Sequence, residues 1–106
     1  MNLVKKDYPL DATLAKYGLS RPEFKAILER QGNICPICFH IPKTGRWVID
    51  HKHVSGYKKL SPEKRKELVR GITCWYCNRW HLAKGMSIEK ADNIIAYLEE
   101  FERRKP

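Results

Sequence analysis

The sequence predicts a small α+β domain, with short strands and a helix at its centre and flanking N- and C-terminal helices. Three observations support this prediction: two Cys-x-x-Cys pairs, an apolar stretch at residues 47–49 that suits a buried strand, and helical periodicity near both ends of the chain. A chain of 106 residues buries only a modest core, so domains of this size often need a disulfide or a metal ion.

The N-terminal part of the chain is predicted to contain two helices. Residues 11–17 suit one short helix. Ser20 and Glu23 form an S-x-x-E capping box, which predicts a second and clearer helix over residues 21–31 that ends at Gly32. Its apolar residues share one face: Phe24, Ile27 and Leu28.

The middle of the chain carries the strand signals. Residues 42–45 suit a turn between two short strands, the second of which covers residues 47–50, and Trp47 is expected in the core. Ser61 and Pro62 predict the start of a basic helix that runs to residue 69.

The C-terminal part returns to helix after a strand or turn at residues 71–74. Residues 78–84 have helical character and stop at Gly85, and Ser87 is the expected N-cap of a final helix over residues 87–104. The apolar residues of that helix recur at helical spacing: Ile88, Ala91, Ile94, Ile95, Leu98 and Phe101. We expect this face to pack on its own domain by default, and the alternative is a contact between two chains.

These elements form one predicted domain over residues 1–106. We divide it into an N-terminal extension (1–19), a lead-in helix (20–32), a metal-stapled core (33–85) with a basic insertion (57–70), and a C-terminal helix (87–104).

The charge of the chain indicates a polyanionic partner. Lys and Arg number 21 against 12 Asp and Glu, which gives a formal net charge of +9. Nucleic acid is the simplest such partner. An anionic membrane surface is the alternative, but no basic amphipathic helix with a large apolar face stands out. No apolar run approaches the roughly 18 residues of a membrane span, so we expect no membrane partner.

Two Cys-x-x-Cys pairs indicate a structural zinc site made by Cys35, Cys38, Cys74 and Cys77. Two disulfides are the competing interpretation. The N-terminus lacks the apolar core of a secretory signal, which favours a reducing, cytoplasmic setting and therefore a metal.

A second polar cluster follows the predicted strand at Asp50, His51 and His53. If zinc joins the two cysteine pairs, Asn78 comes near Asp50. Carboxylate and amide oxygens suit Mg²⁺ or Mn²⁺ rather than zinc, and His51 would then be available as a general base. The structural alternative is an Asp that caps a turn beside solvated histidines.

The ordered motifs "CPIC…VIDHKH…LVRGITCWYCN" resemble those of the phage recombination endonuclease VII group within the HNH, or ββα-metal, nucleases. The resemblance covers roughly residues 17–98. It implies a zinc-stapled ββα-metal (treble-clef-like) domain and a phage or bacterial setting, with the host cytoplasm as the place of action.

The resemblance also implies roles for individual residues. Asp50 and Asn78 match the ligands of the catalytic metal, His51 matches the general base, and the four cysteines match the zinc ligands. His53 matches the second histidine of the motif, which could orient the water or the phosphate or could itself be the base. The family has an acidic residue shortly after the Asn, whereas this chain has Arg79, Trp80 and His81, so His81 is a possible auxiliary ligand or phosphate contact.

Contacts to DNA are expected from the basic residues of the central and C-terminal parts of the core. The candidates are Lys58, Lys59, Lys64, Arg65, Lys66, Arg70, Arg79 and Lys84. The aromatic side chains Trp75, Tyr76 and Trp80 could stack on unpaired bases, but side chains beside a zinc knuckle more commonly pack over the metal site.

The sequence therefore predicts a Mg²⁺-dependent DNA endonuclease with one catalytic metal and a His general base, acting on branched DNA or as a nickase. The alternatives are a non-catalytic zinc module that binds nucleic acid and a homing- or restriction-type HNH enzyme that cuts a specific duplex sequence. A homodimer through the final helix is an open alternative, because a two-fold dimer would suit a symmetric DNA junction.

Overall fold

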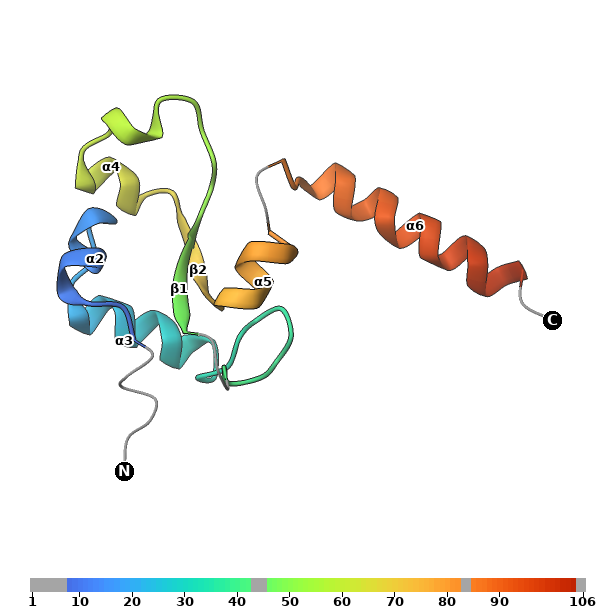
Figure 1. Ribbon diagram of the computed structural model, residues 1–106, viewed down its shortest axis with the longest axis horizontal. Coiled ribbons are helices and arrows are strands. Elements are labelled where there is room, and N and C mark those ends of the chain that lie inside the picture. The colour runs from blue at the N-terminus through green and yellow to red at the C-terminus, as the bar shows by residue number, and fades with distance from the viewer. Residues whose placement is uncertain (1–7, 43–45, 83–84, 105–106) are drawn as a thin grey trace.

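The structure is a computed structural model that describes residues 8–42, 46–82 and 85–104 (Figure 1). Its centre is a two-stranded antiparallel sheet of β1 (Trp47–His51) and β2 (Val69–Cys74), and α5 (Trp75–Trp80) follows β2 directly. The small α+β class is therefore confirmed.

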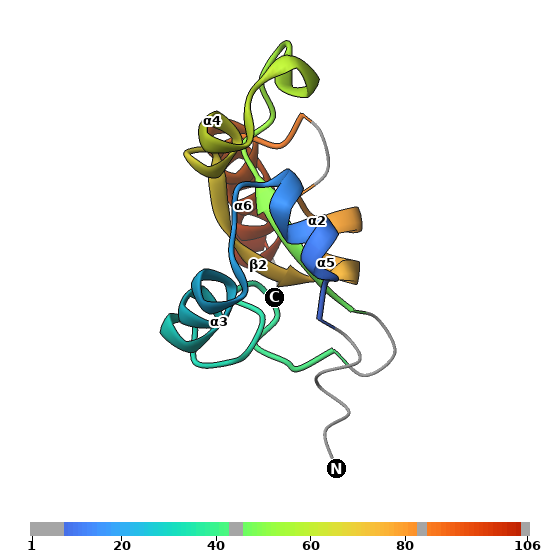
Figure 2. The same cartoon turned by 90° about the vertical axis from the view of Figure 1, so that its left-hand side faces the viewer.

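The remaining helices lie on both sides of this sheet. On one side are α2 (Asp11–Lys16), α3 (Arg21–Arg30) and α4 (Pro62–Lys66), and α5 lies on the other (Figure 1). Figure 2, which looks onto the first side, shows α2 in front of the strands. A 3-10 turn, η1 (Tyr57–Lys59), lies between β1 and α4.

The helix α3 begins at the predicted capping box. The Ser20 hydroxyl accepts a hydrogen bond from the Glu23 backbone N–H at 3.2 Å, and the Glu23 carboxylate accepts one from the Ser20 N–H at 2.8 Å. This reciprocal pair satisfies two of the backbone donors that a helix start leaves unpaired. Phe24 and Leu28 of the predicted apolar face are buried, and Ile27 packs against them.

The core is small and contains sulfur. Its apolar members are Leu14, Leu19, Phe24, Leu28, Trp47, Ile49 and Ile72, together with Cys35, Cys74 and Cys77. Trp47 is 1% exposed, so its predicted place in the core is confirmed. Because three cysteines belong to the same cluster as the apolar side chains, the packing of the core and the geometry of the cysteines depend on each other.

The side chain of Gln31 joins α3 to β2. Its Oε1 accepts a hydrogen bond from the Ile72 N–H at 2.9 Å, and its Nε2 donates to the Ile72 carbonyl at 2.7 Å. The amide thus satisfies the outward-facing backbone groups of β2 as a third strand would. A Cβ on Gly71 would lie 2.9 Å from Gln31 Oε1, so the lack of a side chain at Gly71 accommodates this contact.

Gly18 allows α2 to approach α4. It has a φ of +73°, and a Cβ there would lie 2.3 Å from the Pro62 carbonyl oxygen. Any side chain would therefore meet both backbone strain and a clash.

The predicted hairpin is wrong. Residues 39–42 form no strand, and the predicted turn at 43–45 lies outside the described residues. The partner of β1 is β2, with Trp47 opposite Cys74. Two features disfavour a strand in the earlier segment: Phe39 has a φ of +61°, which is not extended, and Pro42 lacks a backbone donor.

Two helix boundaries also differ from prediction. The basic helix ends at Lys66 rather than at residue 69, because Val69 already belongs to β2. The later helix begins at Trp75 rather than at residue 78, so Cys77 of the second cysteine pair lies within it, and it ends at Trp80. The Cys74 sulfur lies at its N-cap and accepts from the Cys77 N–H.

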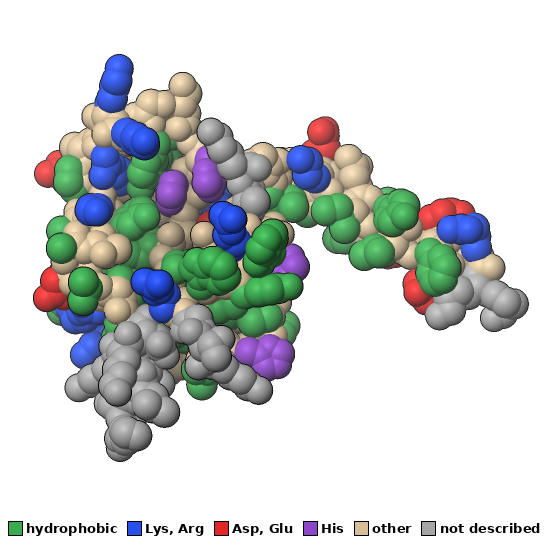
Figure 3. Space-filling model, viewed as in Figure 1, with side chains coloured by type: hydrophobic (Ala, Val, Ile, Leu, Met, Phe, Trp, Pro, Cys, Tyr) green, Lys and Arg blue, Asp and Glu red, His purple; other side chains and the backbone are tan. Residues whose placement is uncertain are grey.

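The final helix, α6 (Ile88–Arg104), does not pack on the domain as we expected by default. None of its described residues is buried, and Figure 1 shows it projecting away from the sheet. Figure 3 shows hydrophobic side chains exposed along its length. In the part of the chain that the structure describes, no helix is long and apolar enough to cross a membrane.

Candidate metal centre and active site

The four cysteines form one cluster. Their sulfur atoms all lie within 4.8 Å of one another, and none of the four is in a disulfide. Bonds of about 2.3 Å to a tetrahedral zinc ion place the sulfurs about 3.8 Å apart. The Sγ atoms of Cys38 and Cys74 lie 3.9 Å apart. The donor set therefore fits zinc in a closed, structural site.

Backbone donors favour the thiolate form of Cys35 in this cluster. Burial by itself would raise the pKa of the thiol, but backbone N–H groups of Cys38, Cys74 and Ile37 outweigh it and lower the pKa to about 7. Burial dominates at Cys77 and raises its pKa. Zinc binding requires thiolates, so metal would displace protons from the cluster.

Asp50 lies at the end of β1 and is buried, with an exposed fraction of 4%. Its carboxylate accepts two hydrogen bonds from one guanidinium, because Arg70 Nε lies 2.7 Å from Oδ2 and Nη2 lies 2.9 Å from Oδ1. Asn78 Nδ2 donates to the same Oδ1 at 3.3 Å. The expected approach of Asn78 to Asp50 is therefore confirmed, while their roles as metal ligands stay predictions.

A bulge in the sheet accompanies the Arg70 contact. Asp50 pairs with Gly71 and His51 pairs with Val69, so the register shifts between them and Arg70 has no direct partner in β1. An extra residue of this kind bends a strand and redirects its side chains. Contact with Asp50 raises the pKa of Arg70, so its guanidinium remains cationic.

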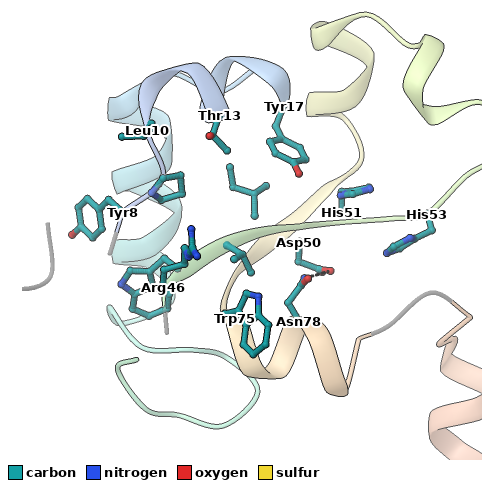
Figure 4. A pocket seen from close by; sticks show the side chains of 14 residues that line it. Tyr8, Leu10, Thr13, Tyr17, Arg46, Asp50, His51, His53, Trp75 and Asn78 are labelled. Atoms are coloured by element: carbon teal, nitrogen blue, oxygen red, sulfur yellow. Dashed lines mark hydrogen bonds between the residues drawn. The ribbon is translucent and has the colours of Figure 1, made fainter. Parts of the chain in front are cut away.

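His51 lies near Asp50 and His53 (Figure 4) and is held within a stack of rings. Its ring centroid lies 4.2 Å from that of Tyr57 and 4.9 Å from that of His53, both with an interplanar angle of 21°. Tyr17 of the segment after α2 approaches His51 at 5.7 Å. These contacts restrict the orientation of the imidazole.

The surroundings of His51 favour its neutral form. Partial burial has the largest effect and lowers the pKa from the ordinary value of 6.5. A charge on His53 acts in the same direction, as do the guanidinium groups of Arg70 and Arg65, whereas Asp50 raises the pKa. A lowered pKa is what a general base near neutral pH needs.

Asp50, His51, His53 and Asn78 line one groove of about 810 Å³ (Figure 4). Tyr8, Leu10, Thr13 and Tyr17 line it from the α2 side, and Arg46 and Trp75 line it from the start of β1 and α5. The polar residues predicted from sequence thus share a cavity that solvent and a substrate can enter.

The carboxylate and amide fit a hard divalent cation. Carboxylate oxygens offer about four acceptor positions, and Asp50 uses three of them for Arg70 and Asn78. Turning the Asn78 amide to present its oxygen removes one of these bonds and supplies a second oxygen ligand. Mg²⁺ typically takes one or two protein ligands and keeps several waters, so this set is sufficient.

The basic residues predicted to bind DNA fall into two groups. Three of them have protein partners that explain their position: Arg70 binds Asp50, Lys66 pairs with Glu23, and the Arg65 guanidinium donates to the carbonyls of Lys16 and Lys58. Arg65 also lies over the Tyr57 ring at 5.2 Å, so it supports the stack that holds His51.

The other basic candidates are exposed or lie outside the description. Lys58, Lys59, Lys64 and Arg79 are exposed. Arg79 lies over the Trp80 ring at 5.3 Å. Lys84 lies outside the described residues.

The aromatic residues near the second cysteine pair are exposed rather than packed over the metal site. Trp75, Tyr76 and Trp80 have exposed fractions of 44%, 58% and 59%. His81 contacts the edge of Tyr76 at 5.6 Å and is not among the residues that line the groove, so the structure does not bring it to Asp50.

Sequence reasoning missed two residues of the site. Tyr57 was included only as part of the basic insertion, although it stacks on His51, and Arg70 was treated as a DNA contact, although it binds Asp50. A tyrosine within a lysine-rich segment was the available signal for the first. No local signal identifies the second, because the Asp50 contact spans 20 positions of the sequence.

The fold and the site define a small α+β domain with a four-cysteine cluster beside an Asp–His–Asn groove. The family described as recombination endonuclease VII matches residues 11–100. The chain belongs to the recombination endonuclease VII family, as its motifs led us to expect, and this membership points to a nuclease.

Two curated phage proteins are similar to the chain. It is 35% identical to the Gene 59 protein of Mycobacterium phage D29 over 89 residues, which are 82% of this chain and 47% of that protein. It is 36% identical to the Gene 59 protein of Mycobacterium phage L5 over 87 residues, which are 80% of this chain and 46% of that protein. The chain thus spans about half the length of these relatives. No solved structure matches it significantly.

Proposed function

We propose that this protein is a Mg²⁺- or Mn²⁺-dependent DNA endonuclease of the HNH, ββα-metal type. The observation that carries the proposal is the contact of Asp50 with Asn78 beside His51, in a groove that is open to a substrate. Family membership and the order strand, strand, helix around the cysteines support it.

The proposed chemistry is hydrolysis of a phosphodiester. His51, neutral near pH 7, accepts a proton from the attacking water, and its stack with Tyr57 and His53 holds the imidazole in position for that transfer. His53 is proposed to orient the water or the phosphate, and the alternative is that it is itself the base.

Asp50 and Asn78 would hold the divalent cation. The cation, when bound, supplies Lewis-acid stabilisation of charge on the phosphate oxygens. Arg70 fixes the direction of the Asp50 carboxylate through its paired hydrogen bonds.

The exposed cations are proposed to bind the DNA backbone: Lys58, Lys59, Lys64 and Arg79. Neutralising phosphates releases counterions, so affinity should fall steeply with salt. The substrate class that we propose is DNA with branched or nicked structure, and the zinc cluster is proposed as the structural support of the site.

Plasmid cleavage tests this proposal. Supercoiled plasmid incubated with the protein and Mg²⁺ or Mn²⁺ should be nicked or linearised, and His51→Ala should lose at least about 100-fold in rate, as expected for a lost general base. His40→Ala is the matched control, because the exposed His40 side chain lies outside the residues that line the groove. Intact plasmid with the wild-type protein across several divalent metals would overturn the proposal.

A specific observation favours a second candidate, a non-catalytic zinc module that binds nucleic acid. Arg70 binds both oxygens of Asp50, and a buried carboxylate that is paired with an arginine can be purely structural. The two candidates separate on metal dependence. A binding module would bind DNA equally well with and without Mg²⁺, whereas a nuclease would cleave only with the metal.

Three further features of the proposal concern the whole molecule. We propose that residues 1–106 act as one domain, and that the protein works in the cytoplasm of a phage-infected bacterium, for which the phage relatives are the support. We also propose a homodimer through α6, because Ile94, Ile95 and Leu98 share a helix face and are each at least 45% exposed.

A further inference from the structure

The groove extends well beyond the Asp50–Asn78 pair. It is lined by this pair and the two histidines. Its other walls include the rings of Tyr8, Tyr17 and Trp75, and the cation Arg46 lies just before β1. The Trp75 N–H donates to the Arg46 carbonyl at 2.9 Å, so the ring of one and the charge of the other are attached to adjacent backbone. A ligand in this space would contact rings, a cation and the proposed reaction centre together.

The size of the groove suits a ligand of small-molecule dimensions. Pockets for such ligands typically enclose about 300–1,000 Å³, and this groove encloses about 810 Å³. A nucleotide is a ligand of this size, whereas a double helix is not. The main part of a duplex would therefore lie outside the groove, on the exposed lysines.

The chemistry of the walls suits a base and its phosphate. Trp75 lines the groove and is 44% exposed, so part of its indole is accessible for stacking. Aromatic side chains stack on any unpaired base because every base has a π-face. Asp50 is the only carboxylate among the described residues that line the groove, so little opposes a phosphate near Arg46.

We propose that this groove binds an unpaired nucleotide next to the phosphate that is cut, with its base on Trp75 and a flanking phosphate at Arg46. The inference rests on the proposed nuclease function and specifies its substrate. A base inside a duplex must first leave its stack, at a cost that an already unpaired base avoids. The groove would therefore select DNA with an unpaired nucleotide over uniform duplex.

Binding to two matched DNAs tests this inference. One is a duplex with a single bulged nucleotide, and the other is the fully paired duplex of the same length. Affinities are measured without added divalent metal and without chelator, so that no cleavage occurs and the zinc is retained. The wild-type protein should prefer the bulged duplex by about 5- to 150-fold, the range that one stacked base supplies.

The variants separate the groove from general DNA binding. Trp75→Ala should abolish the preference, and Trp75→Phe should retain most of it. Trp80→Ala removes a still more exposed indole from the same helix outside the groove, so it should keep the preference. Arg46→Gln should weaken binding to the bulged duplex and reduce its salt dependence by the equivalent of about one phosphate contact.

A second measurement avoids dependence on the folding of a variant. 2-Aminopurine at the bulged position of the DNA should lose fluorescence when wild-type protein binds, because stacking quenches it, and it should keep its fluorescence at a paired position. Equal affinity for the two DNAs, or equal loss of preference in the Trp75 and Trp80 variants, would overturn the inference. Plasmid cleavage by the same preparation would still stand in that case, so failure here is distinct from failure of the nuclease proposal.

Discussion

Asp50 and Arg70 illustrate how a single ion pair can serve both stability and chemistry. The carboxylate is 4% exposed, and a buried charge without a partner destabilises a fold strongly. Arg70 supplies two charge-assisted hydrogen bonds while its own side chain remains 41% exposed. The same guanidinium orients the carboxylate and would compete for it with the divalent cation that we propose.

The first prediction concerns this pair. Arg70→Gln should lower the free energy of unfolding by about 1–3 kcal/mol, a value between those for exposed and buried pairs because Arg70 is partly exposed. Chemical denaturation measures the loss, and the double variant with Asp50→Asn should recover part of it. Mg²⁺ should stabilise Arg70→Gln more than the wild type, because the competing charge is gone. Equal stabilisation by Mg²⁺ would show that the cation does not bind at Asp50.

The second prediction concerns the pH dependence of cleavage. The pKa of His51 is lowered from 6.5. The imidazole therefore remains neutral, and able to accept a proton, at a lower pH than an ordinary histidine does. A cation on Asp50 would lower the pKa further by repulsion. In a plot of kcat/KM against pH, the midpoint of the acidic limb should therefore lie below pH 6.5, the ordinary pKa of histidine. A limb at or above 6.5 would indicate that a different group is the base.

Sequence reasoning identified polar residues that share the groove but not the residues that hold them in place. The positions of Asp50, His51 and Asn78 follow from motifs whose spacing is fixed by the cysteine pairs. The contacts of Arg70 and Tyr57 depend on a bulge and on ring packing, which connect segments of the chain that no local pattern relates.

At the scale of elements, the helices were more predictable than the strand pairing. The capping box of α3 and the periodicity of α6 are local signals, and both helices begin within one residue of their predicted positions. Strand pairing is not local. Residues 39–42 resemble a hairpin arm in composition, but β1 pairs with β2 across an insertion that contains η1 and α4.

The third prediction tests how α3 supports β2. Gln31→Ala should cost about 1–3 kcal/mol, because it leaves the backbone groups of Ile72 without their side-chain partner. Gly71→Ala should also destabilise, since its Cβ would lie 2.9 Å from Gln31 Oε1. In the Gln31→Ala background the second substitution should cost less, because the clashing atom is gone. Strict additivity in urea unfolding would contradict this account.

At the scale of the whole molecule, the cysteine cluster compensates for a small hydrophobic core. Seven apolar side chains and three cysteines make up the buried cluster among the described residues. This is little for a chain of 106 residues. The cluster joins the turn after α3 to the junction of β2 and α5. Asp50 lies on β1, which pairs with β2, and Asn78 lies on α5.

The fourth prediction concerns a zinc ion bound by the four cysteines. Removing zinc with a chelator should abolish cooperative unfolding of the core, since the binding free energy of a structural zinc ion is part of the folding free energy. Circular dichroism and a colorimetric zinc assay measure the two changes together. Cys35→Ser should behave like the chelated wild type. Full retention of cooperative unfolding without zinc would show that the thiols pack as ordinary core residues.

The last prediction concerns α6, which stands apart from the rest of the chain with a continuous apolar face. Leaving Ile94, Ile95 and Leu98 in water is unfavourable by about 25 cal/mol per Å² of exposed apolar surface, so contact with a second copy would stabilise the helix. Sedimentation analysis of the wild type should show a concentration-dependent dimer, and Leu98→Glu should make it monomeric. Asn93→Glu adds the same charge about 140° around the helix and should leave the dimer intact. A wild-type protein that remains monomeric at high concentration would exclude the homodimer while leaving the proposed chemistry of a single domain unaffected.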